Sequence, residues 1–186
     1  MGVDFTAYLA HEFQEKDLNR LVQDLNENIE QFQFINKFID YFMEYNPEDK
    51  EKEWRFDSYN IGGTKGILGP CGINLVFSEK VCRFSHYTRW RFFLIDKEIQ
   101  CRFREVSYEL MQILNSPFVI YVPDSSARES AIVDFLWEDE NKDVFFMQEW
   151  LLNNCGPSKQ SIEEIYVEYE DYWESKGYFI DEFNDF

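Results

Sequence analysis

The glycine-rich stretch at residues 62–72 is the first place in this sequence where backbone amides could converge on a phosphate group. It holds five of the eight glycines of the chain. A phosphate-binding loop has a glycine directly before its lysine and a helix after it, whereas Lys65 follows Thr64 and a run of β-forming residues follows the stretch. We therefore expect a mobile loop between two strands, with a lid over a ligand as the alternative.

Two histidines and four cysteines are the other residues suited to catalysis or metal binding. They lack the Cys-x-x-Cys and His-x-x-x-His spacings that are typical of zinc sites. A nucleophilic cysteine requires a base and an electropositive setting, and the sequence positions of His11 and His86 indicate no such pairing. We predict reduced, buried and inert thiols, no metal, no cofactor and no catalytic residue, and we favour a protein that is not an enzyme.

A basic island lies between Arg83 and Arg104. It contains five of the eight arginines, carries a net charge of +4 and is interleaved with aromatic residues. Such a mixture can bind nucleic acid or an anionic ligand. The alternative, which the overall charge favours, is internal pairing of these arginines with the acidic C-terminal third, because arginine suits buried ion pairs. The residues of the candidate anion site are Lys65, Arg83, Arg89, Arg91 and Asp124.

Acidic residues dominate the C-terminal third. The whole chain has a net charge of −18, and residues 129–186, with 16 acidic residues and three lysines, contribute −13 of it. This field repels nucleic acid and anionic membranes and attracts cationic partners; the alternative is that it only keeps the protein soluble. Our leading hypothesis is a non-catalytic, immunity- or inhibitor-like interaction module that binds a basic protein partner. The expected contact residues are Glu168, Asp171, Tyr172, Trp173 and Glu174, with Asp181 and Glu182 as rim charges.

Two other functional hypotheses stay open. One is a small-molecule or anionic-ligand binding protein or enzyme, with its site near the basic island and the 62–72 stretch. The other is a homo-oligomer that buries its aromatic surface in its own interface, since the sequence leaves the oligomeric state open. No apolar run is long enough to span a bilayer, and no secretory signal precedes the first strand-like residues, so we expect a cytoplasmic protein without membrane contact.

Hydrophobic periodicity predicts an α+β fold. The 35 aromatic residues among 186 provide ample core material, and we expect a single domain over 1–186, made of a sheet-containing core (1–125) and a helical acidic extension (126–186). The topology we predict is a mostly antiparallel sheet of about five strands packed with helices, with a split βαβ core as one candidate. Strand-like patterns of β-forming residues predict strands at 3–9, 54–61, 73–77 and 81–87, and a continuous apolar run predicts a buried strand at 118–122. Helical spacing and capping signals predict helices at 17–42 (with a break near Asn26 and Asn28), 99–114, 126–136, 144–152 and 161–176.

Overall fold

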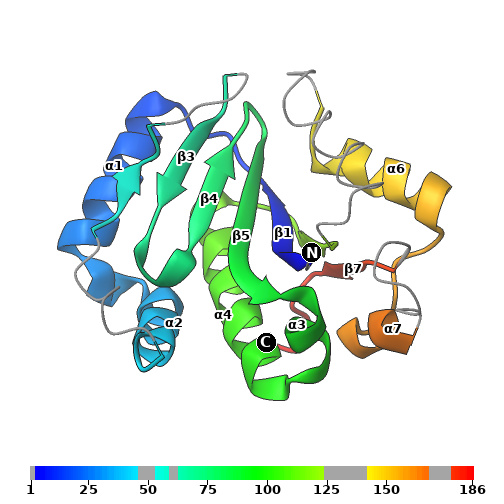
Figure 1. Cartoon of the computed structure of the whole chain (residues 1–186). Helices are drawn as coiled ribbons and strands as arrows, with labels where there is room; N and C mark the ends of the chain where they lie inside the picture. Colours follow the sequence, from blue (N-terminus) through cyan, green and yellow to red (C-terminus); the bar gives the residue numbers. More distant parts are fainter. Residues whose placement is uncertain (1–2, 46–52, 59–62, 124–141, 168–176) are drawn as a thin grey trace.

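The computed structural model describes residues 3–45, 53–58, 63–123, 142–167 and 177–186. These residues form a seven-stranded antiparallel sheet with strand order β2-β3-β4-β5-β1-β6-β7, packed with helices (Figure 1). The strands are β1 (Asp4–Ala10), β2 (Arg55–Phe56), β3 (Lys65–Leu68), β4 (Asn74–Phe77), β5 (Val81–Arg89), β6 (Val119–Tyr121) and β7 (Phe179–Asp181). The helices are α1 (Glu15–Glu27), α2 (Gln33–Met43), α3 (Trp90–Ile95), α4 (Lys97–Leu114), α6 (Val144–Cys155) and α7 (Ile162–Val167), with short 3-10 turns η1 (Ile29–Gln31) and η3 (Pro70–Gly72).

Strand β1 occupies a central position in the sheet. It pairs antiparallel with β5 from Asp4↔Arg89 to Ala10↔Val81, and on its other side with β6 at Ala7↔Tyr121. Because β5 and β6 are both antiparallel to β1, they run parallel to each other with β1 between them, and α3 and α4 connect them. This arrangement is a split βαβ unit, the topology that we considered from the sequence.

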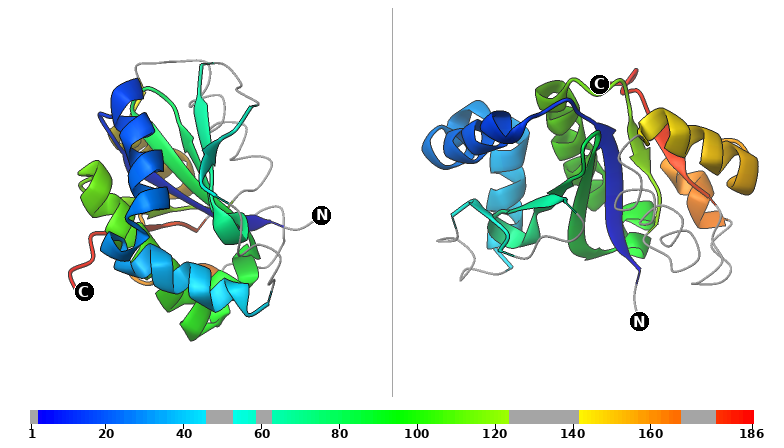
Figure 2. Two further views of the ribbon diagram at one scale, coloured as in Figure 1. Left: turned by 90° about the vertical axis from the view of Figure 1, so that its left-hand side faces the viewer. Right: turned by 90° about the horizontal axis from the view of Figure 1, so that it is seen from above.

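The side chains of β1 alternate between two hydrophobic cores, because successive residues of a strand point to opposite faces. Phe5, Ala7 and Leu9 belong to the larger core, which α1, α2 and α4 cover on one side of the sheet (Figure 2). Tyr8 belongs to the smaller core, where it meets Met147 and other buried residues of α6. The central strand is therefore buried on both faces.

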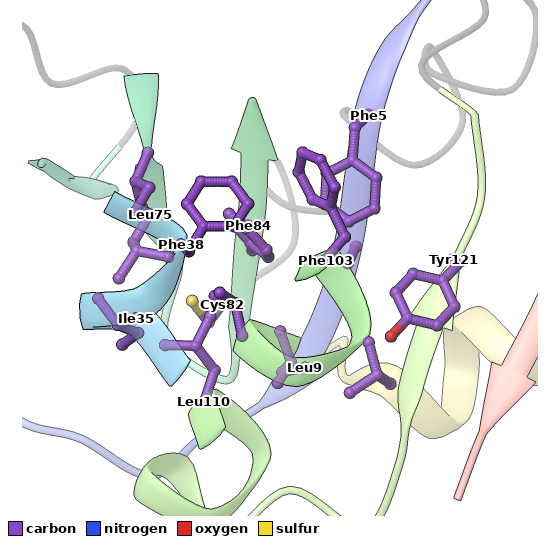
Figure 3. Close-up of a cluster of buried hydrophobic side chains, with 14 of the residues drawn as sticks. Phe5, Leu9, Ile35, Phe38, Leu75, Cys82, Phe84, Phe103, Leu110 and Tyr121 are labelled. Atoms are coloured by element: carbon purple, nitrogen blue, oxygen red, sulfur yellow. The ribbon is translucent and has the colours of Figure 1, made fainter. Parts of the chain in front are cut away.

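An aromatic cluster joins the helices to the sheet, with Phe103 of α4 near its centre (Figure 3). The Phe103 ring is fully buried. Its centroid lies 4.2 Å from that of Phe5, 5.0 Å from that of Phe38 and 5.2 Å from that of His86. Tilted and edge-on contacts of this kind add to the stabilisation that comes from buried area alone. The cluster therefore fixes how α2 and α4 lie on the sheet.

Side-chain and backbone caps are present at several helix ends, and those at Asn115 and Asp143 confirm the sequence prediction. Asp96 accepts hydrogen bonds from the backbone amides at the start of α4, and Asn115 ends that helix with a left-handed φ of 55°. Asp143 caps α6 in the same way as Asp96 caps α4. The predicted break in the helix at 17–42 is also present, because α1 ends at Asn28. The side-chain amide of Asn26 donates a hydrogen bond to the Trp54 carbonyl oxygen at 2.9 Å, and its Oδ1 accepts one from the Trp54 backbone amide at 2.8 Å. These bonds give this weak helix former a tertiary role.

Three sequence predictions need correction. The 62–72 stretch is not a loop throughout, because β3 pairs there with both β2 and β4. The strand predicted at 54–61 has only Arg55 and Phe56 in β2 among its described residues. The C-terminal third is not only helical, because β7 pairs with β6 and extends the sheet to seven strands instead of about five. In each case pairing with another strand decides the outcome, and for β7 that partner, β6, is distant in sequence, so the pattern of the segment itself does not contain the information.

Two predicted helices lie wholly or partly outside the described residues. The one at 126–136 lies outside them, and of the one at 161–176 only residues 161–167 are described, with α7 over Ile162–Val167. Among the described helices, none combines the length and apolar character needed to cross a membrane.

We predict that Phe103→Ala lowers the free energy of unfolding by about 3–5 kcal/mol, because it removes the ring at the centre of the aromatic cluster and leaves a cavity. The matched control is Phe92→Ala on α3, where the side chain is 50% exposed and the expected change is within about 0.5 kcal/mol. Urea denaturation of both variants measures the difference. Equal losses in the two variants would contradict the central role of Phe103.

Candidate functional site

A cleft of about 900 Å³ lies where β1 ends. The segments that meet there are the end of β1, the start of α1, the β4–β5 turn, the C-terminal end of α4 and the start of α6 (Figure 1). Four carboxylates line it, and we call it the acidic cleft: Glu12, Asp17, Glu79 and Asp143. Among its described lining residues, Lys80 is the only lysine or arginine, so the lining carries a net negative charge.

The four carboxylates differ in how they are held. Asp17 accepts a hydrogen bond from the Gln14 amide at 2.9 Å, and Asp143 accepts one from the Phe145 amide at 3.0 Å. These capping contacts fix two negative charges at helix N-termini, where they are favourable. Glu12 and Glu79 are exposed, and neither forms an ion pair within the described part of the chain. Their charges are therefore available to a partner.

Apolar residues form the rest of the acidic cleft. Leu114 is buried, Ile113 and Phe13 are half-buried, and Phe145 is 56% exposed. An apolar floor beside carboxylates suits lysine and arginine side chains, whose carbon stems pack on apolar surface while their charged ends reach polar groups. The acidic cleft is thus chemically matched to a cationic protein segment.

His11 lies at the base of the acidic cleft and has a structural role. Its Nε2–H donates to the carbonyl oxygen of Ser78 at 2.8 Å, and its Nδ1 accepts from the Phe13 amide at 3.0 Å. Burial lowers the pKa of His11, although hydrogen bonds to backbone oppose this effect. The ring is therefore neutral with both nitrogens engaged, and it ties the end of β1 to the β4–β5 turn.

His86 and the cysteines do not form a nucleophile–base pair. His86 Nε2–H donates to the carbonyl oxygen of Cys71 at 2.7 Å, and Nδ1 accepts from the Thr88 amide at 3.0 Å. Burial lowers the pKa of His86 to about 4, whereas burial raises the pKa of Cys82 and of Cys101. Thiolates are disfavoured in such surroundings.

Cys71 and Cys82 are buried, so the prediction of buried thiols holds for those two. Cys101 is exposed. Within the described ranges, no three His, Cys, Asp or Glu side chains lie close enough to one another to hold a single metal ion.

Arg104 connects the basic island to the C-terminal segment. Its Nε and Nη2 donate to both carboxylate oxygens of Asp181, at 2.7 and 3.1 Å, and its Nη groups donate to Asp185 at 2.7 and 3.0 Å. The guanidinium also lies 5.4 and 5.3 Å from the ring centroids of Phe183 and Phe186. Although burial opposes the charge, the hydrogen bonds with Asp185 and Asp181 raise the pKa of Arg104. For this arginine, the structure agrees with internal pairing.

The other basic residues of the island have separate surroundings. Lys97 pairs with Glu163 of α7, which again joins the island to the C-terminal third. Arg89 pairs with Asp4 at 2.7 Å. Arg102 lies within 4 Å of two glutamates of its own helix. Arg83 has no ion-pair partner among the described residues. Because Arg89, Lys97 and Arg104 are paired with carboxylates, the island is not one continuous anion-binding surface.

The predicted site residues fall into three groups: those outside the described residues, the two described C-terminal acids, and the residues proposed for an anion site. Those outside the described residues are Glu168, Asp171, Tyr172, Trp173, Glu174 and Asp124. Asp181 is 2% exposed and bound by Arg104, which corrects its expected place as a rim charge, whereas Glu182 is exposed.

Of the residues proposed for an anion site, Lys65 pairs with Glu15 at 2.8 Å, and Arg91 is exposed on α3. Arg83 is the member that lines a cavity.

Sequence reasoning did not identify Glu12 and Glu79 as site residues. Each lies beside a predicted strand end or turn, so the local signal was an exposed acid like many others in this chain. Their proximity arises only because β1 pairs with β5 and brings the end of β1 to the β4–β5 turn.

Comparison with protein-family models, curated proteins and solved structures gives no significant match. Function must therefore be inferred from the geometry and chemistry of the chain itself.

We predict that stability falls as the pH decreases from 7 to 5. The His86 pKa is about 4 in the folded state and 6.5 for an unperturbed histidine, so between these values the unfolded chain binds a proton that the folded chain does not. This effect is absent above pH 6.5 and removes about 2 kcal/mol of stability at pH 5. His11 acts in the same direction, whereas Glu109, whose pKa is raised by burial, acts in the opposite one.

Urea unfolding at the two pH values measures the change, with His86→Gln as the control. The variant should lose less stability than the original protein between pH 7 and 5. An identical pH dependence would mean that His86 is not the group responsible.

Proposed function

We propose that this protein is a non-catalytic interaction module, of the immunity or inhibitor type, that binds a basic protein partner at the acidic cleft. The observation that carries the proposal is the convergence of four carboxylates on an apolar floor in a cleft of about 900 Å³. A pocket of this size accommodates several side chains of a partner segment.

Long-range electrostatics support a basic partner. The net charge of −18 attracts cationic proteins and accelerates their encounter with the chain. It also disfavours nucleic acid, which carries the same sign of charge. Charge steers encounter more than it adds to affinity, so a tight complex also needs close contacts within the cleft.

Those close contacts follow from the lining of the acidic cleft. A lysine or arginine of the partner would lay its carbon stem against Phe145 and Ile113 and direct its charged end to Glu12 or Glu79. Asp17 and Asp143 are already ordered by their capping bonds, so placing them requires little further loss of conformational freedom on binding.

The apolar surface continues from the acidic cleft along α6. Phe146 and Leu152 are 42% and 52% exposed on this helix. Large exposed apolar side chains beside a charged rim are typical of protein-binding surfaces. The C-terminal residues predicted from the sequence form a second proposed contact region: Glu168, Asp171, Tyr172, Trp173, Glu174 and Glu182.

We predict that the double variant Glu12→Lys/Glu79→Lys binds its basic partner at least about tenfold more weakly than the wild type. The reason is that each substitution places a positive charge against a positively charged partner. The matched control is Glu30→Lys/Glu44→Lys, which makes the same change in net charge at exposed positions outside the cleft. Tagged proteins are used to capture partners from the lysate of the source cells at about 50 and about 300 mM salt, and retained proteins are quantified by mass spectrometry. Wild type and control should retain the same basic protein, less of it at the higher salt.

A carbodiimide cross-link locates the contact directly. It joins a carboxylate to an amine in contact, so the proposal requires a bond between a partner lysine and Glu12 or Glu79. A third bait, Glu168→Lys/Asp171→Lys/Glu174→Lys, tests the second region. If no basic protein is retained, or if neither set of reversals weakens its retention, the proposed function is wrong.

A further inference from the structure

A second cavity, of about 310 Å³, lies on the sheet at β1, β4 and β5. Its chemistry differs from that of the acidic cleft, because polar side chains and one arginine line it. Its lining includes four side chains of these strands: Thr6, Asn74, Arg83 and Ser85. The cavity lies toward the N-terminal half of β1, whereas the acidic cleft lies at the other end of this strand.

Strand register places these polar side chains in one row. Thr6 of β1 and Asn74 of β4 both lie directly opposite Ser85 of β5. Residues directly opposite each other in an antiparallel pair share a face of the sheet, and Arg83, two residues before Ser85, points to the same face. Three adjacent strands therefore present a polar surface next to a guanidinium, on the face opposite the aromatic cluster.

Among the described residues, two buried polar atoms of this row find no hydrogen-bond partner: Nε of Arg83 and Oδ1 of Asn74. A buried polar group without a partner is costly to the folded state, and more so when it is charged. Other arginines of the island are engaged, as Arg104 is by Asp181 and Arg89 is by Asp4. Arg83 and Asn74 are thus a donor and an acceptor that the described part of the protein leaves unsatisfied.

The rim of the cavity sets limits on what can enter. Asp4 lies there, but Arg89 holds its carboxylate at 2.7 Å, which reduces its repulsion of an anion. Tyr87, 51% exposed, provides an aromatic wall. Its ring lies against Gly72, whose φ is +79° and where any Cβ would collide with the ring. The glycine-rich stretch therefore contributes to this site, because Gly72 allows the Tyr87 ring to approach the backbone.

We infer that this cavity binds a small molecule that carries one carboxylate or phosphate group and a hydroxyl group. The oxyanion accepts hydrogen bonds from the Arg83 guanidinium, whose planar array of donors matches such groups. The hydroxyl donates to Oδ1 of Asn74. A single anionic group is expected because the net charge of −18 repels ligands that carry several such groups. The inference is independent of the proposed protein partner.

Nuclear magnetic resonance of the full ¹⁵N-labelled chain tests this directly. The Arg83 Nε–H resonance is identified by its loss in Arg83→Lys. The probes are glycolate, acetate, glycerol 1-phosphate and inorganic phosphate, each titrated to about 20 mM, which is twenty times a millimolar Kd, with ethylene glycol as the neutral control. We expect a saturable shift with glycolate or glycerol 1-phosphate, stronger than with the matching probe without a hydroxyl. Glycolate identifies a carboxylate ligand, and glycerol 1-phosphate identifies a phosphate ligand.

Thermal unfolding provides a second readout that does not depend on assigning a resonance. For a Kd of about 1 mM, the effective probe at about 20 mM should raise Tm by about 4–7 °C. The wild type and the exposed-arginine control Arg91→Gln should show this rise, and Arg83→Gln should not. The inference is overturned if no oxyanion shifts the Arg83 Nε–H resonance saturably, or if Arg83→Gln is stabilised as much as the wild type.

Discussion

The pairing of β1 with β5 and β6 is the constraint on which the rest of this structure depends. It joins residues 4–10 to residues 81–89 and 119–121, and it places one strand between two cores. Phe5 contributes to the aromatic cluster under α4, and Tyr8 to the core under α6. Both candidate sites lie along this strand, since the acidic cleft adjoins Ala10 and the polar cavity adjoins Thr6. A change that displaced β1 would therefore disturb both cores and both sites together.

Charge is distributed unevenly, and the fold uses the two signs differently. Arg104 and Lys97 are engaged by acidic residues of the C-terminal third, so part of the basic island holds the C-terminal segment against α3 and α4. The Arg104–Asp181 pair is largely buried and has matched hydrogen bonds, which makes its geometry demanding. Exposed pairs such as Arg20–Asp24 contribute little to stability. Other acids of the described chain, among them Glu12 and Glu79, are exposed, where they affect the choice and the approach of partners.

The two sites have opposite chemical preferences, and the sheet keeps them apart. In the acidic cleft, Glu12 and Glu79 extend from the end of β1 and from a turn, so they are exposed to an approaching macromolecule. In the polar cavity, Arg83 and Asn74 project from neighbouring strands and are half-buried, which suits a small molecule. Side chains on strands are held more rigidly than those on loops. The structure is therefore compatible with a protein partner at one end of β1 and a small anion near the other.

The sequence by itself determined the α+β class, the strand at β1, the β4–β5 hairpin, the break near Asn28 and the caps at Asn115 and Asp143. These features depend on side-chain periodicity and on hydrogen bonds between near neighbours, which a local pattern contains. Only the tertiary structure decided that β3 and β7 are strands, that Asp181 is buried beside Arg104, and that Glu12 lies near Glu79. Apart from β3, which pairs with its neighbours along the chain, these outcomes depend on contacts between segments far apart in the chain. A short strand is stable only when a neighbour satisfies its backbone groups, and an exposed acid becomes part of a site only when the fold brings a second one beside it.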